Sequence, residues 1–321
     1  MKNDKNLKIV CLGGGVGTVQ LIRGLREYSK DITVICSMAD DGGSAGRLRR
    51  IYSVPPPGDL INCLAALSDA EPALKELLTF RFEGNRYGGD HSLVGQKLGN
   101  LILVALTKTT GNFNTALNEV HRIFSSHGRI IPATVENVSI SARTIDGKII
   151  DGEEKIDRGE YNGPRGLSHV YLEPENSHAP QEAIAAIEKA DIIIAGPGDL
   201  YTTILPVLLV KDIQNAIQKS QGKKIFVVNV ANKPFETPNY AISDFLTAIT
   251  KHCGQFPFKY VLANNNLLPK MPSKLRYAYV KPEEPKSANG LSVIYTDLIN
   301  EDYPLYHDPQ KLAKKVISIV E

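Results

Sequence analysis

The chain has 321 residues, of which 42% are hydrophobic and 22% charged. This composition is typical of a globular protein and excludes the disordered and fibrous classes. Lys and Arg number 37 against 35 Asp and Glu, and the formal net charge of +2 is too small for a general nucleic-acid binder. We therefore expect no nucleic-acid partner, and any anion site should be local.

The cysteines and the hydropathy of the chain bear on whether the protein is secreted, membrane-bound or cytoplasmic. The four cysteines are Cys11, Cys36, Cys63 and Cys253. They are too far apart for a Cys-x-x-Cys metal or redox pair, which favours buried free thiols in a reducing compartment. The first six residues are polar, unlike a signal peptide, and no apolar run approaches the ~20 residues of a membrane helix. We expect a cytoplasmic protein with no membrane insertion.

Short apolar runs alternate with helical patterns along most of the chain. Strands are predicted at residues 8–12, 32–37, 191–195, 224–230 and 260–263. Helices are predicted at residues 19–28, 60–67, 73–80, 98–106, 116–124, 179–189, 208–218 and 240–250. This alternation predicts an α/β fold, Rossmann-like and doubly wound, in which a mostly parallel sheet carries helices on both faces.

The pattern changes between residues 129 and 172. Alternating segments at 134–140 and 148–150 flank Asp146-Gly147, a pair typical of a hairpin turn. We predict a small antiparallel β-hairpin insert over residues 129–172, whose hairpin pairs with residues 170–172. Residues 1–128 and 173–321 would form one Rossmann-like nucleotide-binding domain, so that the chain is a single domain overall. The insert could be a structural ribbon or a contact in a homodimer.

A glycine-rich loop follows the first predicted strand and leads into a helix. Its residues are Gly13, Gly14, Gly15, Gly17 and Thr18, on both sides of Val16. Bare backbone amides at a helix start suit a phosphate, although a purely steric tight turn is the alternative. The dinucleotide fingerprint G-x-G-x-x-G fails at Thr18, which argues against a dinucleotide-dependent oxidoreductase. A Walker sequence is also absent, so ATP hydrolysis of that type has no support.

Two adjacent carboxylates, Asp40 and Asp41, follow the second predicted strand and precede several glycines and Arg47. The carboxyl end of a strand is the edge at which open α/β sheets bind ligands. The aspartates could hold Mg²⁺ or a ribose hydroxyl, and Arg47 could bind phosphate. An Asp-capped turn with a solvated arginine is the alternative. We expect neither aspartate to be a buried structural carboxylate.

Three further polar residues are predicted to reach the same edge. Asp59 and Asn62 follow a stiff loop at residues 55–58, and Asn100 stands before an apolar run. Asp59 could contact the ligand or serve only as a helix N-cap, and the sequence does not separate these two roles.

A second glycine-rich loop comes directly after the buried strand at residues 191–195. The ligand-binding positions assigned to it are Gly196, Pro197, Gly198, Leu200, Tyr201 and Thr202. Asn229 follows the next strand and offers a neutral hydrogen-bonding group. Two such loops in one chain fit a ligand with a central diphosphate, such as a nucleotide conjugate. We therefore expect Gly15 and Gly198 to meet in one cleft.

Several motifs taken together carry a family resemblance over nearly the whole chain. They are Gly13 to Gly15 with Gly17, residues 39–44 (Ala-Asp-Asp-Gly-Gly-Ser) with 46–49, residues 56–59 with Asn62, residues 99–101, residues 196–198 with 200–202 and 205–206, and His307-Asp308. Jointly they resemble the family that unites the 2-phospho-L-lactate transferases (CofD) and the gluconeogenesis factors (YvcK-like proteins).

The Asp-Asp-Gly-Gly-Ser and Gly-Pro-Gly-x-Leu-Tyr-Thr forms are similar to the gluconeogenesis-factor branch. That resemblance implies a cytoplasmic regulatory protein that binds a UDP-sugar and is needed for cell shape and for growth on gluconeogenic carbon sources. The alternative that it leaves open is a Mg²⁺-dependent transferase that acts on a nucleotide-activated phospho-acid.

The chain departs from the pattern of that branch at three places. Gln96 stands where a histidine is common, and Tyr306 where an arginine is common. The usual Gln-Pro-Gly-Glu-Thr-Asp is replaced by residues 233–238, which include Lys233 and Phe235. These changes bear on recognition of the sugar end of a ligand more than on nucleotide binding. Glutamine also removes a proton-transfer group, so we expect binding without turnover.

Overall fold

A computed structural model describes the chain over residues 6–83, 93–159, 166–272, 276–283 and 290–320. Its centre is a sheet of seven parallel strands in the order β12-β10-β8-β7-β1-β2-β3. The bounds are β1 (Ile9–Gly13), β2 (Ile32–Cys36), β3 (Arg129–Pro132), β7 (Ile192–Ala195), β8 (Lys223–Val227), β10 (Tyr260–Asn264) and β12 (Ser292–Thr296). The predicted α/β fold is confirmed.

The five inner strands of this sheet are the five that the sequence predicts. β1, β2 and β7 are buried at every residue, which explains why each reads as an unbroken apolar run. The two edge strands, β3 and β12, are not predicted. β12 is half exposed along its length, so its sequence lacks the hydrophobic signal of an inner strand.

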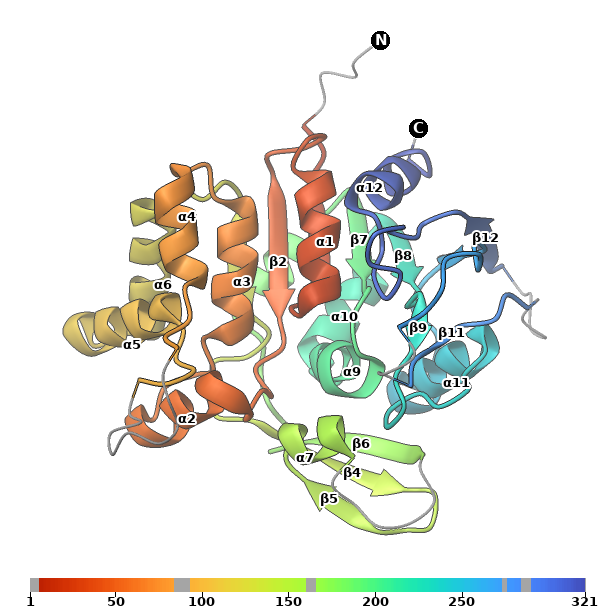
Figure 1. Ribbon diagram of the computed structural model, residues 1–321, viewed down its shortest axis with the longest axis horizontal. Helices are drawn as coiled ribbons and strands as arrows, with labels where there is room; N and C mark the ends of the chain where they lie inside the picture. The colour runs from red at the N-terminus through yellow and green to blue at the C-terminus, as the bar shows by residue number, and fades with distance from the viewer. Residues whose placement is uncertain (1–5, 84–92, 160–165, 273–275, 284–289, 321) are drawn as a thin grey trace.

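Helices cover both faces of the sheet. They are α1 (Val16–Leu25), α2 (Gly43–Tyr52), α3 (Gly58–Leu67), α4 (Pro72–Thr79), α5 (Leu98–Thr110), α6 (Phe113–Ile123), α7 (Glu153–Arg158), α8 (Gln181–Glu188), α9 (Leu205–Leu208), α10 (Lys211–Lys219), α11 (Ile242–Cys253) and α12 (Pro309–Ile317), with one π-helical turn, η1 (Leu200–Ile204). α1 packs between α3 and α12 (Figure 1). Among the described residues, none of these helices is long and apolar enough to cross a membrane.

The chain reverses its direction of travel across the sheet between β1 and β7. From β1 it moves outward through β2 to β3, and from β7 it moves the other way through β8 and β10 to β12. Because parallel crossovers are right-handed, α1 and α10 lie on opposite faces. The loops after β1 and β7 therefore separate at a topological switch point, which is where open α/β sheets bind ligands.

The insert is a separate three-stranded antiparallel sheet below the main sheet (Figure 1), in the order β5-β4-β6. It consists of β4 (Ser139–Thr144), β5 (Ile149–Asp151) and β6 (Leu167–Glu173), with α7 between the last two. The hairpin turns at Asp146-Gly147, where Gly147 has φ +87°, and Ala142 pairs with Val170. Its predicted start at residue 129 is wrong, because residues 129–132 are β3 of the main sheet.

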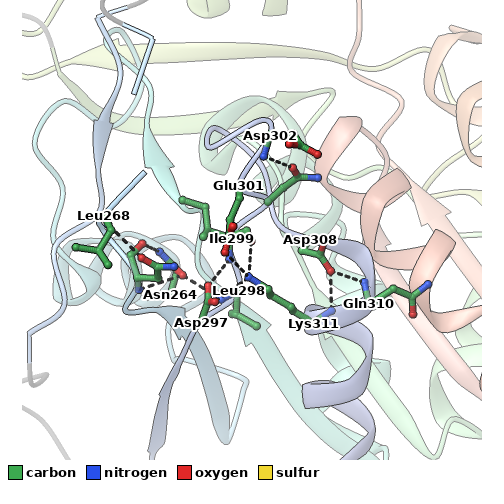
Figure 2. A network of polar contacts seen from close by, with 12 residues as sticks. Asn264, Leu268, Asp297, Leu298, Ile299, Glu301, Asp302, Asp308, Gln310 and Lys311 are labelled. Carbon is green, nitrogen blue, oxygen red and sulfur yellow. Dashed lines mark hydrogen bonds and ion pairs between the residues drawn. The ribbon is translucent and has the colours of Figure 1, made fainter. Parts of the chain in front are cut away.

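A polar network fixes the segment between β12 and α12 against the carboxyl end of β10 (Figure 2). Asn264 Oδ1 accepts a hydrogen bond from Leu298 N at 3.0 Å, and Lys311 Nζ donates to Asp297 Oδ2 at 2.7 Å. Asp308 caps α12 by accepting from the amides of Gln310 and Lys311. Since α12 also packs on α1, the residues just before it are held near the β1 loop.

Candidate functional site

The two glycine-rich loops meet in one cleft at the switch point, as expected. Gly196 N donates to Leu12 O at 3.2 Å, so the second loop leaves the sheet directly beside the first. Gly15 and Gly198 both line a cavity of about 170 Å³ between the loops. Side chains from other segments complete its wall, namely Thr203, Asn229, Lys233, Tyr277, Tyr306 and His307.

The first turn of α1 faces this cleft without a side-chain cap. The helix begins after Gly15, no side chain caps it, and its first turn carries no acidic residue. The backbone amides of a first turn have no partner within the helix, and they carry the positive end of the helix dipole. Val16 and Gly17 line the cavity. This end of α1 is therefore suited to a phosphate oxygen.

Gly17 and Thr18 join the two loops. A Cβ added at Gly17 would lie 2.4 Å from the carbonyl oxygen of Pro197. Thr18 Oγ1 accepts from Gly14 N at 3.0 Å and donates to Pro197 O at 3.4 Å. Thr18 is fully buried, and a Cβ at Gly13 would meet its hydroxyl. We assigned Thr18 as a ligand contact, but in the structure its hydroxyl instead links the two glycine loops.

The amide of Gly198 is not free to bind a phosphate. It donates to Asn229 Oδ1 at 3.0 Å, so this asparagine holds the second loop. We predicted that the second loop binds an anion through its amides, but the Gly198 amide already has a hydrogen-bond partner. Asn229 keeps its amide nitrogen for a ligand, because no hydrogen bond from that atom to the described residues is seen.

Leu200, Tyr201 and Thr202 face the protein interior, contrary to their assignment as ligand contacts. All three are buried. Tyr201 Oη lies 2.7 Å from Tyr240 Oη, and Thr202 Oγ1 donates to Glu236 Oε1 at 2.9 Å. In η1 it is the next residue, Thr203, that lines the cavity. The sequence places this motif correctly after β7 but does not show which of its side chains turn outward.

Lys233 stands at the centre of three carboxylates beside the cleft. Its Nζ forms ion pairs with Asp157 of the insert, with Asp199 at 2.8 Å and with Glu236 at 3.3 Å. Burial lowers the pKa of Lys233, but the three carboxylates outweigh burial and raise it overall. Burial and the charge of Asp199 raise the pKa of Glu236 to about 7. Oxygens of the three acids lie within 4.8 Å of one another, and the ammonium occupies the place of a cation.

His307 presents an unused acceptor to the cleft. The side chain is only 3% exposed, and its Nε2 has no hydrogen-bond partner in the described structure. Burial lowers its pKa to about 4, although a bond to the backbone of Val228 opposes this shift. The ring is therefore neutral at pH 7. A neutral imidazole whose other nitrogen is bound to the backbone can accept a hydrogen bond from a ligand hydroxyl.

Asp40 and Asp41 point to different parts of the structure. Asp41 Oδ1 accepts from Glu154 N at 2.9 Å, so this residue anchors α7 of the insert. Asp40 Oδ1 accepts from Gly42 N at 3.0 Å, and its Oδ2 faces Gly58 at the start of α3. We expected neither to be a buried structural carboxylate; Asp41 is only half-buried, but its hydrogen bond to α7 is a structural contact. As a pair they do not converge on one metal position.

Asp59 is the carboxylate nearest the first glycine loop. A Cβ added at Gly14 would lie 2.6 Å from Asp59 Oδ2, so the carboxyl sits directly against this glycine. Burial, then the charge of Asp40, raises the pKa of Asp59 to about 7, while Lys97 opposes the shift. The N-cap of α3 is Pro57, and Asp59 lies within the first turn of the helix. Asp59 is therefore not the N-cap residue, and its carboxyl lies at the first glycine loop.

Replacing Asp59 with asparagine should stabilise the protein at alkaline pH. A carboxyl whose pKa is raised in the fold makes the native state bind more protons than the unfolded chain, so wild-type stability falls as pH rises from about 4 to about 7. Urea unfolding at about pH 8 should show a gain of up to roughly 4 kcal/mol for Asp59→Asn, which vanishes near pH 4. The exposed Asp302→Asn variant is the control. A gain independent of pH would contradict the account.

The remaining predicted residues lie in a polar group on α2, α3 and α5. Arg47 Nη2 donates to Val94 O at 2.8 Å. With the Gln96 amide assigned so that its oxygen faces the guanidinium, that oxygen accepts from Arg47 Nε at 2.9 Å. Lys97 Nζ donates to Asn62 Oδ1 at 2.5 Å. Arg47 is therefore held by the protein rather than free for a phosphate. Gln96, which stands where the resembled family commonly has a histidine, contacts Arg47.

Asn100 is almost fully buried in this group, and its Oδ1 has no partner within the described residues. Its Nδ2 lies 3.5 Å from Ser44 Oγ. An unpaired buried amide oxygen costs free energy unless a donor reaches it. Asn100 thus remains a candidate contact for a hydroxyl or amide group of a ligand.

The residues that sequence reasoning missed come from segments without a glycine motif. Lys233 follows β9 (Ala231–Asn232), and Tyr277 precedes β11 (Ala278–Tyr279), which pairs with β9 in antiparallel orientation. Thr203 was one residue beyond the assigned motif. His307 was noted only as part of a motif. Lys97 precedes Asn100 by three residues in the sequence. It is buried, which the sequence pattern does not indicate for a lysine.

Comparisons with known proteins agree with this architecture. The family model described as 2-phospho-L-lactate transferase CofD matches residues 9–299. A Bacillus subtilis protein named gluconeogenesis factor is 39% identical over 321 residues, with 98% of each chain covered. One of the same name from Listeria innocua is 32% identical, covering 100% of this chain and 98% of the relative. The crystal structure of a UPF0052 family member from Bacillus halodurans has a TM-score of 0.89 at 34% identity, covering 98% of this chain and 99% of that one.

Proposed function

Because this chain belongs to the CofD family, and relatives that match it over nearly its full length are named gluconeogenesis factors, we propose that it is a gluconeogenesis factor: a cytoplasmic regulatory protein that binds a nucleotide-sugar. The observation that carries the ligand class is the uncapped start of α1 at the switch point, opposite the second glycine loop. That arrangement suits a diphosphate.

The cleft fits the middle of such a ligand rather than the whole of it. Its volume of about 170 Å³ is below the ~300–1,000 Å³ of sites that enclose a complete small ligand. The diphosphate would lie at the start of α1. A hydroxyl of the ribose or sugar would donate to His307 Nε2, whose neutral state at pH 7 leaves it an acceptor. The two ends of the ligand would extend beyond the cavity.

Binding of a UDP-sugar is the direct test of this function. We expect calorimetric titration with UDP-N-acetylglucosamine or UDP-glucose to show one site per chain, and ligand at about 100 Kd to stabilise the fold by ~2.7 kcal/mol. NAD and ATP are the comparison ligands. His307→Phe removes the acceptor at similar ring size and should weaken the nucleotide-sugar more than UDP alone. Equal affinity for all nucleotides would contradict a sugar-specific site.

A transferase of the 2-phospho-L-lactate type is the second candidate, because the matching family model carries that name. Such an enzyme would use Mg²⁺, which prefers carboxylate and water oxygens. Asp59, whose carboxyl lies against Gly14, and Asp40, whose Oδ2 lies against Gly58, are the carboxyls that could hold it. The ion would neutralise charge on the reacting phosphate.

Turnover separates the two candidates. We expect the purified protein to release no nucleotide over hours from UDP-sugars or nucleotide-activated phospho-acids with Mg²⁺, because Gln96, which is bound to Arg47, cannot transfer a proton near neutral pH. Steady Mg²⁺-dependent release that Asp40→Asn abolishes would move the protein to the transferase class. Asp302→Asn is the matched control for such a loss.

A further inference from the structure

A second large hollow lies away from the glycine loops, along α11 and the amino ends of β8 and β10. Its volume is about 1,130 Å³, above the usual range for a small-molecule pocket. Lys223 begins β8 and Tyr260 begins β10, whereas the glycine loops follow the carboxyl ends of their strands. We call this hollow the lysine groove; its walls are residues 220–224, 243, 246–247, 250–251, 256–260 and 290–291.

The lysine groove carries positive charge that nothing in the described structure neutralises. Its lining includes four lysines, Lys223, Lys224, Lys251 and Lys259, and no acidic residue. Lys251 Nζ donates to Ser168 O at 2.6 Å, and Lys224 Nζ to Gln218 O at 3.3 Å. Lys223 Nζ lies 5.6 Å from the centre of the Tyr260 ring. All these partners are neutral, so the four charges are available to an anionic partner.

Apolar side chains form part of the same wall. Phe256 and Phe258 have ring centres 5.6 Å apart, and both contact Phe226 of β8. Leu246 of α11 and Leu291 also line the groove. The rings pack mainly against one another, so they offer an apolar surface but no free face on which a nucleic-acid base could stack.

We propose that the lysine groove binds an acidic peptide segment of a partner protein. The groove is large enough to hold several side chains of such a segment. Its lysines would pair with carboxylates, and its apolar wall would contact one or two hydrophobic side chains of the same segment. A phosphate-rich partner is disfavoured because the lining contains no arginine, the residue whose planar fork suits phosphate. A membrane surface is disfavoured because the charges surround a hollow.

The probe for this interaction is a fluorescein-labelled peptide of glutamates around one phenylalanine, with a glutamine counterpart as the neutral control. Wild-type protein should bind the glutamate peptide, and added salt should weaken binding as the Debye length falls from ~10 Å to ~3 Å. The double variant Lys223→Glu/Lys259→Glu should weaken binding at least about tenfold. Both side chains are exposed, so the unfolding midpoint should not change.

A matched double variant, Lys30→Glu/Lys108→Glu, changes the net charge equally at exposed positions outside the groove. It should keep the wild-type affinity. The proposal is overturned if the wild type does not bind the peptide, if both double variants lose affinity equally, or if an oligonucleotide or vesicles containing phosphatidylserine bind to the groove in preference to the peptide.

Discussion

Replacing Lys233 with methionine should lower the free energy of unfolding by roughly 3–5 kcal/mol near pH 8. Removing one partner of a buried ionic cluster leaves the others uncompensated. Here Asp157, Asp199 and Glu236 would face one another across less than 5 Å without the ammonium. Urea or thermal unfolding of the two proteins would measure the difference.

The loss in Lys233→Met should depend on pH in a defined direction. Lys233 opposes the rise in the pKa of Glu236 that burial and the charges of Asp199 and Asp157 cause. Without the ammonium this pKa rises further, so the native state holds more protons than the unfolded chain. The deficit should therefore be largest above pH ~7 and shrink as pH falls toward ~4. Adding Glu236→Gln to the variant should recover part of the stability.

Lys311→Met is the matched control for this prediction. Lys311 also pairs with carboxylates, Asp297 and Glu301, but this cluster is more exposed. Exposed ion pairs are typically worth ~0–1 kcal/mol. Equal losses in the two variants, or a Lys233→Met deficit that grows in acid, would show that the cluster at the cleft is not the buried, mutually dependent group described above.

Replacing Gly17 with alanine should abolish ligand binding and destabilise the fold. An exposed helical Gly→Ala change alone would stabilise by about 0.5–1 kcal/mol. At this position the new methyl would lie 2.4 Å from Pro197 O, so the two glycine loops must separate. We expect a net loss of about 1–3 kcal/mol from overpacking and at least tenfold weaker binding of the nucleotide-sugar.

Gly222→Ala provides a steric control of the same size. A Cβ there would lie 2.4 Å from Ala190 O, also a backbone carbonyl, but before the amino ends of β7 and β8 and outside the cleft, whereas the glycine loops follow the carboxyl ends of their strands. It should lower stability comparably and leave nucleotide-sugar affinity unchanged. Unchanged binding in Gly17→Ala, or equal loss in Gly222→Ala, would mean that the approach of the two loops does not form the binding site.

The sequence was sufficient to predict the inner sheet and the meeting of its loops. Inner parallel strands are buried on both faces and read as apolar runs, and their carboxyl ends must share one edge. Edge strands such as β12 carry a weaker pattern because one side of each is open. The same reasoning predicted that Gly15 and Gly198 lie in one cleft. That prediction needed only the direction of the parallel strands and the edge at which their carboxyl ends lie.

Side-chain direction within that edge could not be predicted. Asn229 and Thr202 look like ligand contacts in sequence, yet one holds Gly198 and the other turns inward to Glu236. Whether a loop residue faces the cleft depends on backbone dihedrals of a few residues, which no periodic pattern encodes. Lys233 and Tyr277 line the cleft next to the paired strands β9 and β11, which are far apart in the sequence.

The central claim, that one ligand contacts both glycine loops in one cleft, is tested most directly by amide resonances of the protein labelled with ¹⁵N-glycine. Titration with a UDP-sugar should shift Gly15, Gly17 and Gly198 together, with a single dissociation constant and one ligand per chain. Shifts at Gly15 and Gly17 without Gly198, or with different affinities for the two loops, would contradict the claim.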